Sequence, residues 1–139
     1  MRVTDNLRRQ HKELLEIVTE ITSHLIPDEL SKDATYVSSL LLELAENLNV
    51  HLGREDKALY PALFRHPDKK ISKLAKKYLD EMGGISDTFE SYMTRWPHAM
   101  AIHDDPNHFI NETRGIFESL SNRIYKEDNI LYPLLEVIK

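Results

Sequence analysis

Residues 55–61 read Glu-Asp-Lys-Ala-Leu-Tyr-Pro, and residues 127–133 read Glu-Asp-Asn-Ile-Leu-Tyr-Pro. The two copies start 72 residues apart, so the chain repeats itself weakly across its two halves. Each copy lies in a stretch where apolar residues recur every three or four positions, which is the spacing of one face of a helix. The repeat therefore predicts two helical hairpins in tandem, with matching second helices.

Apolar stripes of this kind cover most of the chain, and no segment alternates with a period of two. We therefore expect an all-α fold, an antiparallel up-and-down four-helix bundle. Gly83 and Gly84 fall inside the third stripe, where each glycine costs about 1 kcal/mol relative to alanine, and Pro61 predicts a bend in the second. The predicted helices run from Thr4 to Leu25, from residues 31–33 to residue 66, from Pro67 to Trp96, and from the turn at Asp104–Pro106 to Leu134.

Length and composition narrow the possible classes of protein. The chain has 139 residues, which suits a single domain over residues 1–139, and a formal net charge of −5, which disfavours binding to nucleic acid. It has no cysteine, so thiolate metal sites and disulfides are excluded. No apolar run is long enough for a secretory signal or a membrane span, so we expect a cytoplasmic protein without a membrane partner.

Polar residues interrupt the apolar stripes at one level of the predicted bundle. His11 stands on the first stripe, His51 with Glu55 on the second, and Arg123 with Glu127 on the fourth. Burying an ionised carboxylate costs several kcal/mol unless it is paired or binds a metal. Residues four apart, such as His51 and Glu55, share one helix face, and imidazole with carboxylate suits iron, manganese or zinc.

Each of these residues also has an ordinary explanation. A single histidine on a stripe is more often a satisfied core residue than a ligand, and a glutamate four residues from an arginine or histidine is usually a pair at the rim. It is the combination on independently traced stripes that favours a functional polar core. Five further histidines lie near helix ends or connections and are expected to be peripheral: His24, His66, His98, His103 and His108.

These residues resemble the hemerythrin-like family, also called the HHE cation-binding domain, over nearly the whole chain. The resemblance rests on His11, on His51 and Glu55, on Glu127, and on the Leu-Tyr-Pro that follows each glutamate. It implies a four-helix bundle around a non-haem di-iron centre, with roles in oxygen carriage or sensing, nitric oxide or iron–sulfur repair responses, and iron handling. It also implies that His11, His51, Glu55 and Glu127 are metal ligands.

The chain departs from the family pattern on one side of the implied centre. Met82 and Arg123 stand where the family has histidines, and Ser86 stands where some members have another. Because the guanidinium of Arg123 is permanently charged, we expect it to substitute for the second metal ion. Two alternatives remain open: a site for one iron ion, or a metal-free network of buried ion pairs.

Two classes of function follow from these alternatives. The first is a metal-binding or sensing domain that holds at most one iron ion and takes a small diatomic ligand. The second is a metal-free bundle, with Arg123 in place of the second cation, that binds a protein partner or forms a homodimer. An oxidoreductase has less support, because no separate acid, base or cofactor motif accompanies the polar core.

Overall fold

The structure, a computed structural model, describes residues 3–137. These residues form helices joined by short connections and contain no strand, so the predicted all-α class is confirmed. The α-helices are α1 (Val3–Thr22), α2 (Pro27–Leu30), α3 (Thr35–Arg54), α4 (Tyr60–Phe64), α5 (Lys69–Met82), α6 (Ile85–Arg95), α7 (Ala99–Asp104), α8 (Pro106–Lys126) and α9 (Tyr132–Val137); the π-helical segments are η1 (Glu55–Leu59) and η2 (Glu127–Leu131).

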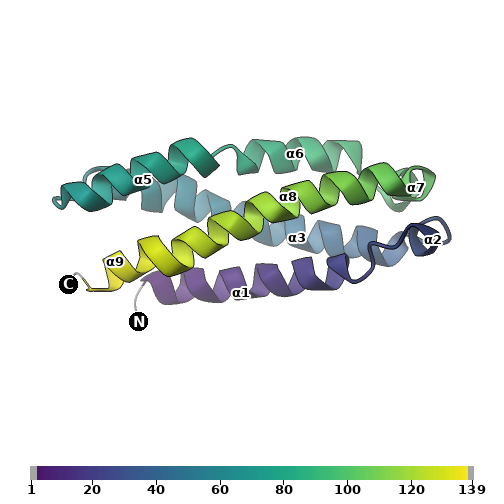
Figure 1. Cartoon of the computed structure of the whole chain (residues 1–139), viewed down its shortest axis with the longest axis horizontal. Coiled ribbons are helices and arrows are strands. Elements are labelled where there is room, and N and C mark those ends of the chain that lie inside the picture. The colour runs from purple at the N-terminus through teal and green to yellow at the C-terminus, as the bar shows by residue number, and fades with distance from the viewer. Residues whose placement is uncertain (1–2, 138–139) are drawn as a thin grey trace.

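The long helical segments lie side by side along the long axis of the molecule (Figure 1). Going along the chain, α1, α3, the α5–α6 pair and α8 run in alternating directions (Figure 1). The α1 helix packs against α3 and α8, and α6 packs against the same two helices. Residues contributed by α1, α3 and α8 can therefore meet in the middle of the bundle.

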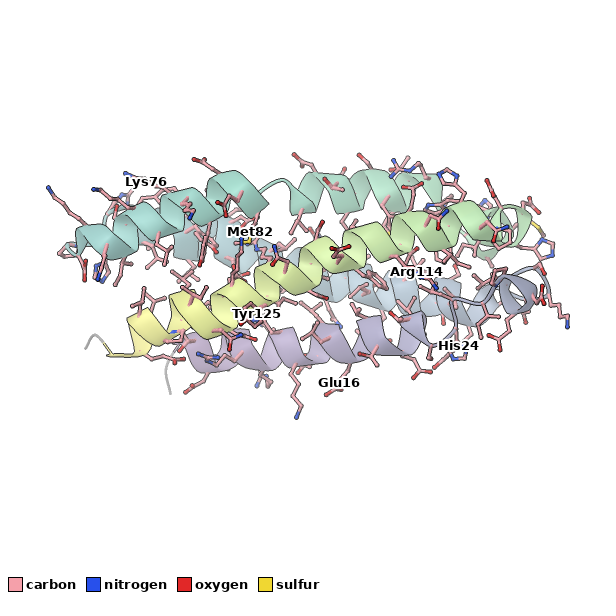
Figure 2. The ribbon with its side chains drawn as sticks, viewed as in Figure 1. Glu16, His24, Lys76, Met82, Arg114 and Tyr125 are labelled. Carbon is pink, nitrogen blue, oxygen red and sulfur yellow. The ribbon has the colours of Figure 1, made fainter. Side chains whose placement is uncertain are left out.

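The apolar stripes form the core, as the spacing predicts. Leu14 in α1, Leu44 in α3, Ile71 in α5 and Phe109 in α8 are all fully buried, and burying one such side chain contributes roughly 1.5–3 kcal/mol. Figure 2 shows the side chains along the whole bundle. Among the described residues, no helix combines the length and the apolar character needed to cross a membrane.

The predicted third helix is broken. Helix α5 ends at Met82 and α6 begins at Ile85, so Gly83 and Gly84 form the junction, as the labelled Met82 in Figure 2 shows. The Gly83 N–H donates to the Leu79 carbonyl at 2.7 Å. A Cβ on Gly83 would lie only 2.5 Å from that carbonyl oxygen, so the tight end of α5 requires glycine here.

The predicted bend near Pro61 takes the form of a π-helical turn, and the same turn recurs before Pro133. Proline has no N–H and its ring collides with the carbonyl four residues earlier, so the helix widens just before it. The N–H of Tyr60 donates to the Glu55 carbonyl, five residues back, and Tyr132 does the same to Glu127. The repeated sequence thus forms the same local structure twice.

Smaller differences concern the ends of helices. The first helix ends at Thr22 rather than at Leu25, and the connections hold the short helices α2 and α7. Both of these follow the ends of long helices, where the apolar stripe stops. Ile102 of α7 and Leu30 of α2 are nevertheless buried and close that end of the core.

Candidate metal centre

Four polar residues from three parts of the bundle meet in the core. His11 comes from α1, His51 from α3, and Glu55 and Glu127 are the first residues of η1 and η2. All four side chains are buried, and a potential ligand atom from each lies within 4.8 Å of the others. Donors bound to one ion at about 2.1 Å can be no more than about 4.2 Å apart. The cluster therefore needs only a small contraction to surround a single cation.

Each histidine has its outer ring nitrogen occupied by a neighbour. The Nδ1 atom of His11 lies 2.7 Å from Oδ1 of Asp128, and Nδ1 of His51 lies 2.6 Å from Oε1 of Gln10. Both partners present oxygen acceptors, so a proton on each Nδ1 satisfies them. This arrangement points the Nε2 atom of each ring toward the cluster, and in histidines with such an outer partner this is the nitrogen that binds a metal.

The inner nitrogen atoms have no hydrogen-bond partner among the described residues. Nε2 of His11 is 3.1 Å from Oε1 of Glu127, and Nε2 of His51 is 2.9 Å from Oε1 of Glu55, but the directions do not suit hydrogen bonds. Oε1 of Glu127 likewise has no hydrogen-bond partner within residues 3–137. Buried polar atoms without partners are rare and costly, so these atoms fit a shared cation between them.

The outer oxygens of the two carboxylates are held by tyrosines in a crossed pattern. Tyr60, which follows η1, donates its hydroxyl to Oε2 of Glu127 at 2.7 Å, and Tyr132, which follows η2, donates to Oε2 of Glu55. Both tyrosines are fully buried. They pack in the core, and they also leave the Oε1 atoms facing the histidines.

Arg123 fills the other side of the cluster. Its Nε donates to Glu127 at 3.2 Å, and its Nη2 donates to Glu55 at 3.4 Å and to Asp56 at 2.6 Å. Its Nη1 donates to the carbonyl of Met82 at 3.2 Å. That carbonyl belongs to the last residue of α5, so the break in the third helix makes it available to the arginine. The arginine therefore reaches both carboxylates, as a second cation would.

The comparisons with known proteins agree with this geometry. The family model of the hemerythrin HHE cation binding domain matches residues 2–135. The chain belongs to this family. Neither the curated proteins nor the solved structures gave a significant match. The buried histidine and glutamate side chains thus form the candidate cation site of a hemerythrin HHE domain.

Burial and charge set the protonation of this hemerythrin HHE cluster. Burial lowers the pKa of His11, but its hydrogen bond to Asp128 and the charge of Glu127 outweigh that effect and raise the pKa to about 9. Burial and the neighbouring Glu127 raise the pKa of Glu55. Burial would also raise the pKa of Glu127, but His11 and Arg123 lower it below its usual value. The metal-free site therefore holds protons that a bound cation would displace.

Three residues of the centre were not predicted from the sequence: Gln10, Asp56 and Asp128. Asp56 and Asp128 directly follow the two glutamates, so the repeat itself carried a signal for them. Nothing in the sequence pattern distinguishes Gln10 from other polar residues near a helix surface. Met82 is buried and contacts Arg123 through its backbone, and the five peripheral histidines belong to no metal-ligating group among the described residues.

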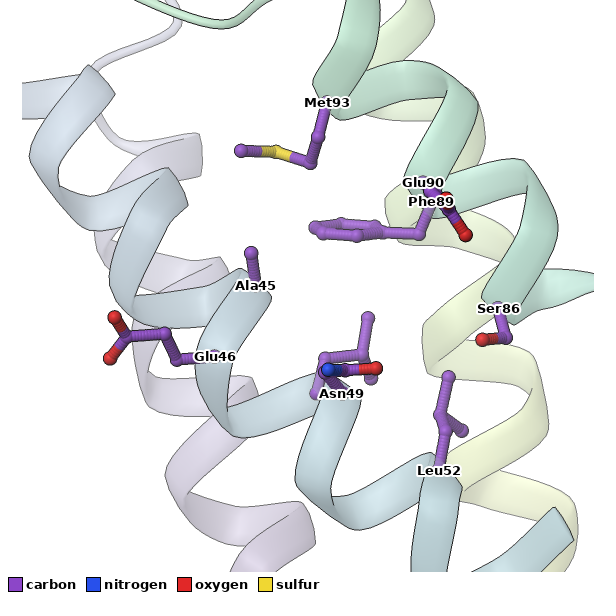
Figure 3. A pocket seen from close by; sticks show the side chains of 9 residues that line it. Ala45, Glu46, Asn49, Leu52, Ser86, Phe89, Glu90 and Met93 are labelled. Atoms are coloured by element: carbon purple, nitrogen blue, oxygen red, sulfur yellow. The ribbon is translucent and has the colours of Figure 1, made fainter. Parts of the chain in front are cut away.

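A surface groove between α3 and α6 is separate from the centre. Its volume is about 460 Å³, and Figure 3 shows Ala45, Phe89 and Met93 around it. Ser86 also lines this groove. None of the four candidate ligands does, so we assign the groove no part in cation binding.

Proposed function

We propose that this hemerythrin HHE domain binds one divalent cation, iron(II), through His11, His51, Glu55 and Glu127. The observation that carries the proposal is the convergence of four buried ligands at one point, where Nε2 of His11, Nε2 of His51 and Oε1 of Glu127 have no hydrogen-bond partner among the described residues. Two imidazoles and two carboxylates are a ligand set that suits iron(II). The tyrosines and the outer partners of the histidines already hold these ligands in place, which reduces the cost of ordering them when the ion binds.

The position of Arg123 supports a single ion rather than two. Its guanidinium contacts Oε2 of Glu127 and Oε1 of Glu55, the Glu55 oxygen that also faces Nε2 of His51. A second divalent ion at that place would lie within a few ångströms of a fixed positive charge, and the repulsion would cost several kcal/mol in a buried site. The family's di-iron centre is thus replaced, in this proposal, by one ion and one arginine.

A sensing role for a small ligand is part of the same proposal. A bound iron(II) ion with few protein ligands supplies an open position for a molecule such as oxygen or nitric oxide. The chain's own part is to hold the ion, to keep water from the buried ligands, and to keep the carboxylates oriented through Tyr60 and Tyr132.

The proposal is tested by the metal content of protein loaded with iron(II) without oxygen. We expect about one ion per chain and loss of most of it in His51→Ala, while the peripheral His66→Ala keeps the wild-type content. Less than about a tenth of an ion per wild-type chain would overturn the proposal. A change in the visible absorption spectrum when oxygen or nitric oxide is added would support the sensing role.

The metal-free alternative is favoured by a different observation. Arg123 already pairs with both carboxylates and is itself satisfied by four acceptors, so the core can be stable without an ion. In that case the bundle would act through its surface, as a protein-interaction module or a homodimer. Absence of iron from the loaded protein, together with a stability that a chelator does not change, would favour this alternative.

A further inference from the structure

Gln10 is the residue that holds the outer nitrogen of His51. It lies in α1, directly before the candidate ligand His11, and its Oε1 is 2.6 Å from Nδ1 of His51 in α3. The rings of His11 and His51 meet edge to face, with centroids 4.6 Å apart. One short stretch of α1 thus supplies one candidate ligand and also supports the other.

The chemistry of the amide decides which nitrogen of His51 carries the proton. An amide oxygen accepts hydrogen bonds and cannot donate them, so with Oε1 facing the ring the proton must sit on Nδ1. In a neutral ring the opposite nitrogen, Nε2, then keeps its lone pair; this atom lies 2.9 Å from Oε1 of Glu55. If the amide nitrogen faced the ring instead, Nδ1 would be the acceptor and Nε2 would carry the proton, which would block binding of a cation.

We propose that Gln10 is a positioning residue that keeps His51 in the Nδ1–H form, with Nε2 free toward the centre. This inference rests on the proposed function for its metal-binding consequence, but the choice of ring nitrogen is a property of the metal-free chain as well. Gln10 is half-buried, so it can be substituted without opening the core.

The two histidines are supported unequally. The Nδ1 atom of His11 is hydrogen-bonded to a carboxylate, Asp128, whereas Nδ1 of His51 is hydrogen-bonded to a neutral amide, Gln10. A carboxylate draws the ring proton more strongly and makes the imidazole a stronger electron donor than an amide does. Gln10 therefore also makes His51 the weaker donor of the pair, and Gln10→Glu should remove that difference.

The first experiment uses metal-free protein and nitrogen NMR of the histidine rings. In the wild type we expect His51 to be protonated at Nδ1 and unprotonated at Nε2. Gln10→Met has a side chain of similar size, and its thioether sulfur is only a weak acceptor, so it should give a mixture of the two forms, whereas Gln10→Glu should keep the wild-type form. Wild-type protein with the proton on Nε2, or Gln10→Met with an unchanged His51, would overturn the inference.

The second experiment measures the affinity for Zn²⁺, a colourless probe ion that needs no exclusion of oxygen. Loss of such an outer partner typically costs 10- to 100-fold in metal affinity, so we expect a loss of that order in Gln10→Met. In Gln10→Glu, affinity should be unchanged or higher. Arg9→Met is the matched control, because Arg9 is the preceding residue in α1 and its exposed side chain pairs with Glu13 on the surface.

The two experiments separate failure of this inference from failure of the proposed function. Wild-type protein that binds Zn²⁺ with the same affinity as Gln10→Met would overturn the positioning role and leave the metal site intact. Wild-type protein that binds neither Zn²⁺ nor iron(II) would overturn the proposed function, while the nitrogen spectra would still decide whether Gln10 sets the protonation of His51.

Discussion

Arg123 is the residue that most clearly sets this centre apart from the family pattern. It is 1% exposed, and the charges of Glu127 and Glu55 raise its pKa even though burial lowers it. Burying a guanidinium costs desolvation free energy. The acceptors around Arg123 compensate for that cost only when all of them are present. The arginine and its carboxylates are therefore expected to depend strongly on one another.

The change Arg123→Met should destabilise the metal-free protein by roughly 3–5 kcal/mol, because it removes the guanidinium that pairs with two buried carboxylates. Urea unfolding in the presence of a chelator measures this loss. Arg95→Met is a suitable control, since Arg95 pairs with Glu112 at the surface, where solvent screens the charges. Equal effects of the two substitutions would show that Arg123 does not neutralise the buried carboxylates.

His11 should make the stability of the metal-free protein depend on pH. Its pKa rises from 6.5 to about 9 on folding, which corresponds to roughly 3 kcal/mol of stability. Below pH 6.5 the ring is protonated in both states and this contribution is fully present; it is lost as the pH rises through 9. Urea unfolding of chelated protein between pH 6 and about 9.5 should show this fall. The His11→Gln variant should not show this fall in the free energy of unfolding. A fall of the same size in that variant would mean that other groups cause the pH dependence.

The buried polar residues of the centre could be identified from the sequence, but the residues that form hydrogen bonds to them could not. A charged residue on an apolar stripe must be compensated, so His11, His51, Glu55, Arg123 and Glu127 could be found from helical spacing alone. Gln10 lies at the edge of a stripe, where polar residues are ordinary. Its role depends on how α1 and α3 face each other, which spacing within one helix does not determine.

Among the elements, the break between α5 and α6 is linked to the centre. An unbroken helix would use the Met82 carbonyl for its own backbone hydrogen bond, and the break leaves that oxygen to Arg123. The glycine pair indicated a weak point in the sequence, but not that the freed carbonyl would face the arginine. The π-helical turns were likewise predicted only as a bend, because proline position does not specify how a helix adjusts.

The two glycines of this break should respond differently to alanine. In Gly83→Ala the new Cβ would meet the Leu79 carbonyl at 2.5 Å, so the end of α5 must shift and stability should fall by about 1 kcal/mol or more. In Gly84→Ala the Cβ meets nothing within 4 Å, and reduced freedom of the unfolded chain should add about 0.4–1 kcal/mol. Thermal unfolding of the two variants measures both effects. A gain in stability for Gly83→Ala would mean that the junction does not need glycine.

Across the whole molecule, the two halves of the repeat are similar helical hairpins that differ in the polar residues of their core. Each half supplies one glutamate, one π-helical turn and one tyrosine, and the tyrosines cross to the glutamate of the other half. The first half adds His11 and His51, which face the candidate cation site. The second half has Met82 and Arg123 near the corresponding positions. The repeat could be read from the sequence, whereas the crossed tyrosine bonds depend on how the halves pack.

Restoring the symmetry should therefore change the metal content of the molecule. In Met82→His/Arg123→His the fixed positive charge is removed, and the new imidazole at position 123 stands four residues before Glu127, as His51 stands before Glu55. Anaerobic loading should then give about two iron ions per chain instead of about one. Met82→His alone keeps the guanidinium between the carboxylates and should stay at the wild-type content. A double variant that folds but gains no iron would show that the second half does not match the first in position, because both ligands and charge would then favour a second ion.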